Sequence, residues 1–248
     1  MTSQNNNYFC VTHISDELCW RAEDAYLLSN KFPIYSIADG ITMTKDGKPD
    51  YEDKTAPTPP RIVANIFCDK SIKYLEKAYP NISSTDIIST FNFALDNIKK
   101  YYRGNSVKHE FGTTAAVVVK KRNTIIGGRF IDSGFALIRN KEIVFKTPEF
   151  HSWRQINEPN KKYNYMGLLD DLTEFVQVYE MEYKKDDLLI LFTDGYEKHF
   201  NNEAFINIFK KSNMGEMQSE FERIDDILSK QNQNDYGTER TAVVIKLT

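Results

Sequence analysis

The segment Leu188-Leu189-Ile190-Leu191-Phe192-Thr193-Asp194-Gly195 is the most informative stretch of this chain, and Ile37-Ala38-Asp39-Gly40 has the same form. Each is an apolar run that ends in Asp-Gly. An apolar run of this length is typical of a buried strand, and Asp-Gly predicts a turn that ends it. The sequence therefore predicts two carboxylates, Asp39 and Asp194, at the ends of two core strands. Carboxylate oxygens are the ligands that Mg²⁺ and Mn²⁺ prefer.

Two further acidic segments fall where strands are expected. Glu23-Asp24 precedes Ala25-Tyr26-Leu27-Leu28, and Asp132 follows Arg129-Phe130-Ile131. An acidic residue is unfavourable in a strand and costly when it is buried without a partner. A single Asp-Gly is commonly only a turn, and a single acid in a strand is commonly at an exposed edge. Four such sites at strand ends, with no matching run of buried cations, favour a shared metal cluster.

Composition excludes several classes of partner. The 248 residues are 41% hydrophobic and 27% charged, which is typical of a globular protein with a large core. Lys and Arg (32) nearly balance Asp and Glu (35), so we expect no nucleic-acid partner. The three cysteines, Cys10, Cys19 and Cys68, fit neither a disulfide framework nor a CxxC site, which predicts reduced thiols in a cytoplasmic protein. No apolar run approaches the ~18 residues that span a bilayer, so we expect no membrane partner.

Periodicity predicts an α+β domain. A helix is expected from the capping residue Thr58 to Pro80, and a second from Ser84 or Thr85 to Gly104. Strands are expected at 115–119, 124–131, 135–138, 142–145, 175–183, 188–192 and 241–247, and shorter helices at 203–210 and 221–228. The four strands between 115 and 145 are predicted to form one antiparallel meander. Because the order lacks a regular βαβ alternation, we predict antiparallel sheets with helices outside. No internal repeat and no linker long enough to divide the chain is visible, so we predict one domain, residues 1–248.

Six motifs, in order along the chain, resemble those of the metal-dependent serine/threonine protein phosphatases of type 2C, the PPM family. They are Arg21-Ala22-Glu23-Asp24-Ala25, Ala38-Asp39-Gly40, Gly112-Thr113-Thr114-Ala115, and the segments 132–140, 187–195 and 240–245. Gly167 also stands where the family has a loop glycine. Each motif is short, but six in the same order over residues 20 to 246 make the resemblance specific.

The resemblance implies a four-layer α-β-β-α sandwich, two antiparallel sheets flanked by helices, with two Mn²⁺ or Mg²⁺ ions in a cleft at one end. Asp39 and Asp194 are the expected catalytic residues. By the same resemblance Asp39 bridges the two ions, the Gly40 carbonyl completes one shell, and Asp194 holds the first ion.

The remaining motifs complete the expected site. The resemblance assigns the second ion to Glu23 or Asp24, directly or through water, and gives Asp132 a part in holding a third, weaker ion. Arg21 is the expected substrate phosphate-binding residue, although it lies two residues before Glu23 where the family usually has four. On a strand both offsets point to the same face, roughly 6–7 Å apart, and an ordinary surface arginine is the alternative interpretation.

The final metal ligand departs from the family pattern. Thr238 stands where the family has a first-metal aspartate. Glu239 follows one residue later and, in a regular strand, would point to the other face. A bulge would bring Glu239 back to the metal, and Asp235 is a second substitute from the preceding loop. We include Glu239 among the predicted metal ligands.

The predicted function is removal of phosphate from phosphoserine or phosphothreonine of a protein by a metal-activated water, a reaction that needs no serine or cysteine nucleophile. The expected partners are that phosphorylated protein and a cognate serine/threonine kinase, and we expect a monomer. A pseudophosphatase acting as a regulatory binding module is the main alternative, because of Thr238. A phosphatase of small phosphorylated metabolites is another. The retained acids favour an active enzyme, since a dead site has no need of costly clustered carboxylates.

Overall fold

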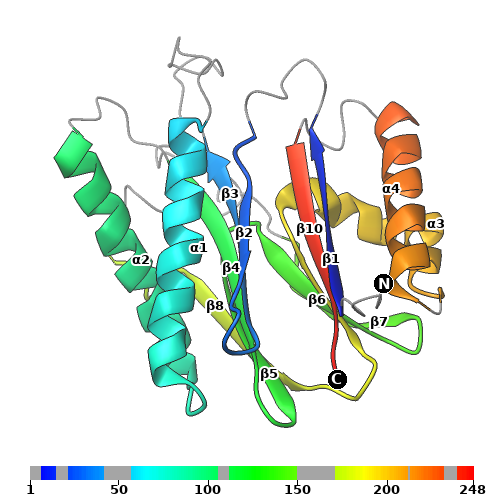
Figure 1. The fold of residues 1–248 in the computed structure, drawn as a ribbon, viewed down its shortest axis with the longest axis horizontal. Helices are drawn as coiled ribbons and strands as arrows, with labels where there is room; N and C mark the ends of the chain where they lie inside the picture. Colours follow the sequence, from blue (N-terminus) through cyan, green and yellow to red (C-terminus); the bar gives the residue numbers. More distant parts are fainter. Residues whose placement is uncertain are drawn as a thin grey trace, which may run out of the picture.

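Two antiparallel sheets of five strands each pack face to face in the computed structural model of the protein (Figure 1). The structure describes residues 7–14, 22–41, 57–105, 112–149, 171–211, 213–231 and 239–248. The first sheet has the order β1 (Tyr8–Ile14), β10 (Glu239–Lys246), β9 (Leu188–Phe192), β6 (Gly134–Arg139), β7 (Glu142–Lys146). The second has the order β2 (Ala25–Leu28), β3 (Ile34–Ile41), β4 (Gly112–Lys120), β5 (Thr124–Phe130), β8 (Val176–Glu182).

Helices cover the outer face of each sheet. Helices α1 (Pro59–Ala78) and α2 (Ser84–Asn105) pack on the second sheet, while the 3₁₀ helix η3 (Asp194–Asn201), α3 (Glu203–Ile208) and α4 (Met214–Gln231) lie on the first (Figure 1). The predicted four-layer α-β-β-α sandwich with two antiparallel sheets is therefore confirmed. No helix of the described residues is both long and apolar enough to cross a membrane.

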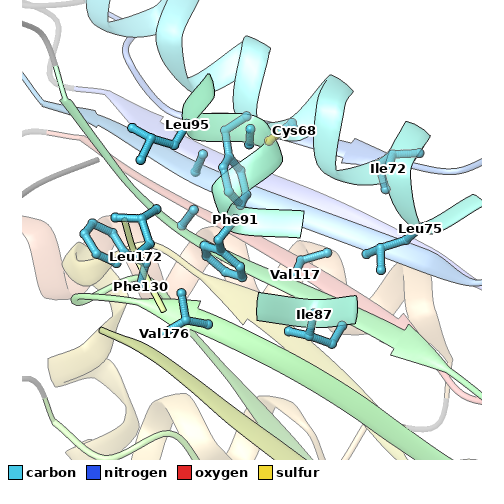
Figure 2. Close-up of a cluster of buried hydrophobic side chains, with 14 of the residues drawn as sticks. Cys68, Ile72, Leu75, Ile87, Phe91, Leu95, Val117, Phe130, Leu172 and Val176 are labelled. Atoms are coloured by element: carbon cyan, nitrogen blue, oxygen red, sulfur yellow. The ribbon is translucent and has the colours of Figure 1, made fainter. Parts of the chain in front are cut away.

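Three apolar layers hold the sandwich together. Figure 2 shows the layer between the second sheet and its helices, where Cys68 and Leu75 of α1 and Phe91 of α2 meet Val117 of β4 and Phe130 of β5. A second layer lies between the two sheets, and a third between the first sheet and α3 and α4. Burial of apolar surface at about 25 cal/mol per Å² is the main stabilising contribution of such layers.

The predicted boundaries of the two long helices are confirmed. The Thr58 hydroxyl accepts a hydrogen bond of 3.4 Å from the Arg61 N–H, and prolines occupy the first turn of α1, where they remove no intrahelical hydrogen bond. Helix α1 ends before Pro80, and α2 runs from Ser84 to Asn105. Helix α4 is longer than the predicted 221–228, because its polar first turns carry no apolar period.

The predicted meander between residues 115 and 145 is wrong. Strands β4 and β5 belong to the second sheet, whereas β6 and β7 belong to the first. The chain passes from one sheet to the other at residues 131–133, where Ile131 has φ 68°. A β-branched residue rarely adopts this left-handed conformation unless tertiary contacts impose it. Turn residues in the sequence predict where one strand ends and the next begins, but they do not indicate to which sheet each strand belongs.

The predicted turn at Asp39-Gly40 is also wrong, because both residues lie inside β3. Asp39 pairs with Thr114 and Gly40 with Thr113 in the antiparallel ladder. A Cβ atom on Gly40 would lie 2.7 Å from the carbonyl of Glu23 and from that of Pro60. Glycine is therefore required here for the close approach of two backbones. The second Asp-Gly does leave its strand, since Asp194 begins η3 directly after β9.

Candidate active site

Four aspartates from four different segments meet at one end of the sandwich. Asp24 immediately precedes β2, Asp39 lies near the end of β3, Asp132 lies in the crossing between β5 and β6, and Asp194 begins η3. The carboxyl of Asp39 is close enough to the other three to be influenced by the charge of each, and it shares a hydrogen bond with Asp24. The structure thus brings together the four aspartates that the sequence nominated.

Burial and mutual repulsion raise the pKa values of these acids. The pKa of Asp39 lies well above its usual range because the group is buried and because Asp24, Asp194 and Asp132 are negatively charged. Burial and the charge of Glu239 raise the pKa of Asp24 to about 8. Crowded carboxyls of this kind need protons or cations to compensate their charge.

Asp24, which precedes β2 of the second sheet, is held in place by residues of the first sheet. It is 2% exposed, and its Oδ2 accepts a hydrogen bond of 2.9 Å from the Thr193 hydroxyl at the end of β9. The N–H of Thr241 in β10 donates to the same hydroxyl oxygen at 2.9 Å. Because the Thr193 hydroxyl donates to one sheet and accepts from the other, it fixes Asp24 relative to the end of β9.

Glu239 is engaged by backbone rather than left free. The N–H of Glu23 lies 2.8 Å from both carboxylate oxygens of Glu239, and the N–H of Asp24 lies 3.0 Å from Oε1. Glu239 therefore holds the Glu-Asp segment in place from the start of β10. Its role as a metal ligand stays a prediction, as do those of Glu23, which is 7% exposed, and of the Gly40 carbonyl.

Asp132 offers an unsatisfied oxygen. Its Oδ1 is buried and has no hydrogen-bond partner among the described residues. The hydroxyl of the adjacent Ser133 is hydrogen-bonded instead to the Thr114 hydroxyl, at 2.8 Å. Asp194 exposes part of its side chain to solvent, but the surrounding protein still desolvates its carboxyl and, with the charge of Asp132, raises its pKa to about 7. A buried carboxylate oxygen without a donor is costly, so Asp132 is suited to a ligand that brings positive charge.

These residues fit a hard cation in their chemistry. The donors are carboxylates, which are the ligands of Mn²⁺ and Mg²⁺, and Asp132 keeps an oxygen available. Within the described ranges, however, no three Asp, Glu, His or Cys side chains are gathered closely enough to hold a metal ion. A cation at this end of the sandwich would therefore have to draw the carboxylates together.

Two of the predicted positions lie outside the described residues: Arg21, the predicted phosphate-binding residue, and Thr238, the substitute for a metal-binding aspartate. Asp235 and Gly167 also lie outside them.

Sequence reasoning missed two cations near this end of the sandwich, Arg129, which acts on Asp132, and Lys146, which lies beside Glu197. Arg129 in β5 is 2% exposed and donates from Nε to Gln177 at 2.8 Å and from Nη1 to the Pro148 carbonyl at 2.6 Å. Its positive charge lowers the pKa of Asp132, although burial has the larger and opposite effect. Lys146 Nζ lies 3.7 Å from Oε1 of Glu197 in η3. No local signal distinguishes such residues from surface charges, because their partners come from distant segments.

Comparison with solved structures shows which known proteins share the fold of this chain. No protein-family model and no curated protein matches the sequence. Among solved structures, the chain is similar to the serine/threonine phosphatase Stp1 from Staphylococcus aureus, with a TM-score of 0.71 and 13% identity over 97% of this chain and 94% of that one. The catalytic domain of the phosphatase PstP, in complex with two manganese ions, gives a TM-score of 0.64 and 13% identity over 96% of each chain.

A third similar structure is PppA, described as a key regulatory component of T6SS in Pseudomonas aeruginosa, with a TM-score of 0.65 and 13% identity over 96% of this chain and 97% of that one. The chain therefore has the fold of the PPM-type serine/threonine phosphatases. The resemblance seen in the sequence motifs is confirmed at the level of the fold.

Proposed function

We propose that the chain is a metal-dependent phosphomonoester hydrolase that removes phosphate from phosphoserine or phosphothreonine of a protein substrate. The observation that supports this most is the convergence of Asp24, Asp39, Asp132 and Asp194 at one end of a phosphatase fold, with raised carboxyl pKa values. The two manganese ions of the similar PstP structure agree with such an acid site.

Each side chain has a distinct proposed part. Asp39, which neighbours the other three aspartates, and Asp194 would hold the divalent cations, with Asp24 beside them. Bound cations of this kind lower the pKa of a water molecule and neutralise phosphoryl charge. Thr193 keeps an oxygen of Asp24 in place, and Glu239 fixes the backbone of the Glu-Asp segment. This scheme needs no side-chain nucleophile.

The test is hydrolysis of p-nitrophenyl phosphate, a phosphothreonine peptide and a phosphorylated sugar by the full chain, with Mn²⁺, Mg²⁺ or EDTA. We expect turnover of the first two with a divalent cation and none in EDTA, and none for Asp39→Asn. Undiminished turnover in EDTA would remove the metal-dependent mechanism. Preference for the sugar phosphate would replace the protein substrate with a small metabolite.

A regulatory pseudophosphatase is the second candidate. It is favoured by Thr238 at a position where the family has an aspartate, and by the lack of a compact three-donor group among the described residues. Calorimetric titration with the phosphothreonine peptide separates the two functions. Binding of the peptide without turnover at any cation concentration would support the binding module.

A further inference from the structure

A second buried cluster of ionisable groups lies on the helix side of the first sheet, around Asp225 of α4. The Asp225 carboxylate accepts a hydrogen bond of 2.7 Å from Nε of Arg240 in β10. Nε2 of His199 in η3 lies 3.1 Å from the same oxygen, and Nδ1 of His13 in β1 lies 3.2 Å from the other. Arg240 also donates to the Ser229 hydroxyl. One carboxylate thus joins four elements, and Figure 1 shows α4 beside β1.

The charge of this cluster is compensated internally. Asp225 is 2% exposed, Arg240 1% and His199 0%. Burial would favour the neutral acid, but the hydrogen bonds from His13, His199 and Arg240 outweigh it and hold the pKa of Asp225 well below its usual range. Burial lowers the pKa of His199, so its imidazole is neutral and donates through Nε2–H. A buried carboxylate satisfied from three sides is rigidly placed.

The first connection from Asp225 to the acid site runs through β10. Successive side chains of a strand point to opposite faces, and Arg240 faces the helices. The side chain of the neighbouring Glu239 therefore faces the other way, where its carboxylate accepts hydrogen bonds from the amides of Glu23 and Asp24. The backbone N–H of Thr241, on the other side of Arg240, donates to the Thr193 hydroxyl. Fixing Arg240 on one face of β10 therefore fixes the strand segment that carries both contacts.

The second connection runs through η3. This short helix begins at Asp194 and contains His199, which contacts Asp225. The Tyr196 N–H donates to the Thr193 carbonyl at 3.0 Å, so the first turn of η3 is tied to the end of β9. Asp194 is the first residue of η3 and follows Thr193 at the end of β9, so the position of the first turn of η3 sets where Asp194 lies.

We infer that Asp225 is a positioning residue for the acid site, acting through Arg240 on Asp24 and through His199 on Asp194. This inference rests on the proposed function, because positioning matters for catalysis only if the acids hold cations. Groups behind the ligands of a metal site commonly change metal affinity or activity by about 10–100-fold when they are mutated. A purely structural ion pair would lower stability without a selective effect on the acids.

The test compares three substitutions with a matched control. Asp225→Asn removes the central charge. His199→Leu cuts only the connection to η3 and leaves Asp225 paired with Arg240, so it keeps the test open if Asp225→Asn does not fold. His199→Gln restores an amide donor. Leu228→Ala is the control, because Leu228 is a buried core residue of the same helix, 3% exposed.

Mn²⁺ affinity is measured by calorimetry, and exchange of the Glu23, Asp24 and Tyr196 amide hydrogens by NMR, at a temperature where every variant is folded. We expect Asp225→Asn and His199→Leu to weaken Mn²⁺ binding by about 10–100-fold and His199→Gln to recover most of it. Asp225→Asn should speed exchange of all three amides, His199→Leu mainly that of Tyr196, and Leu228→Ala none selectively.

The inference is overturned if Asp225→Asn and His199→Leu leave both Mn²⁺ affinity and amide exchange unchanged. It is also overturned if Leu228→Ala changes both to the same extent. If the wild type binds no divalent cation, the proposed function fails, and the amide exchange rates still decide whether Asp225 positions the acids.

Discussion

The hydroxyl of Thr193 donates a hydrogen bond of 2.9 Å to Oδ2 of Asp24, joining residues 169 positions apart in the sequence and belonging to opposite sides of the sandwich. The same oxygen accepts from the Thr241 N–H at 2.9 Å. This contact decides how the acid site is assembled, because it fixes the acid that precedes β2 against the end of β9.

Thr193→Val keeps the shape of the side chain and removes the hydroxyl. We expect Mn²⁺ affinity to fall by about tenfold, as for other groups that orient a metal ligand, with a further rise in the pKa of Asp24 because the ionised form loses a donor. Thr193→Ser retains the hydroxyl and should bind Mn²⁺ like the wild type. Calorimetric titration of both variants checks this, and equal affinities would show that the contact is dispensable.

Asp39→Asn should abolish turnover, because Asp39 neighbours the other three aspartates and its loss removes the shared carboxylate. Asp194→Asn should be nearly as severe. In EDTA, however, Asp39→Asn should raise the free energy of unfolding by on the order of 1 kcal/mol, since it relieves repulsion in the cluster. Asp226→Asn, an exposed acid paired with Lys230, is the control for the charge change. Near-normal rates for Asp39→Asn would mean that this motif is misassigned.

Asp132→Asn should affect turnover and Mn²⁺ binding differently from Asp39→Asn. It replaces the unsatisfied carboxylate oxygen at the crossing between the two sheets. We expect lower turnover while the tighter cations stay bound, because the sequence resemblance gives Asp132 a part in a third, weaker site. Steady-state rates measured beside Mn²⁺ titration separate the two effects. Loss of all Mn²⁺ binding would instead place Asp132 in the main site.

The metal-free protein should lose stability as pH rises. Asp24 has a folded-state pKa raised from 3.8 to about 8, so the folded state holds a proton that the unfolded chain has lost. Stability then falls between pH 4 and about 8, by up to about 1.4 kcal/mol per pH unit for each such group. His199 acts in the opposite direction below its ordinary pKa of 6.5, because its folded-state pKa is lowered. The window that isolates the acids is therefore pH 6.5 to 8.

Thermal unfolding in EDTA across this window measures the effect. Asp24→Asn should flatten the profile, and saturating Mn²⁺ should do the same by replacing the protons. Asp225, whose pKa is lowered, contributes a constant amount at these pH values. A wild-type stability that is flat or rising between pH 6.5 and 8 would contradict the assignment of the raised pKa values.

Thr238→Asp should tighten binding of the first cation. The sequence resemblance assigns Thr238 to the position of a first-cation ligand, where a hydroxyl in place of a carboxylate would remove one negative charge, and hard cations depend on ligand charge for affinity. We therefore expect the wild type to need high Mn²⁺, and the variant to need less. Thr238→Asn, which is neutral, is the matched control. If the aspartate fails to improve affinity, Glu239 or Asp235 already supplies the charge.

The local sequence predicted several helices and strands of this protein correctly. The capping residue Thr58, Pro80 and the apolar periods predicted α1 and α2, and the run Leu188 to Phe192 predicted β9 without error. These features depend on neighbours a few residues apart, which propensity and capping describe well. The positions of the four aspartates were likewise visible, because an acid at the end of an apolar run is conspicuous.

Tertiary structure alone decided how those pieces meet. The passage from β5 in one sheet to β6 in the other, the Glu239 carboxylate on the amides of Glu23 and Asp24, and the Asp225 cluster all join segments far apart in the chain. Charge and hydrogen-bonding partners of a buried group depend on what folding brings beside it. A sequence pattern can therefore nominate an acid such as Asp39, but only the packed sheets give it the burial and the three acidic neighbours that raise its pKa and make it a candidate for catalysis.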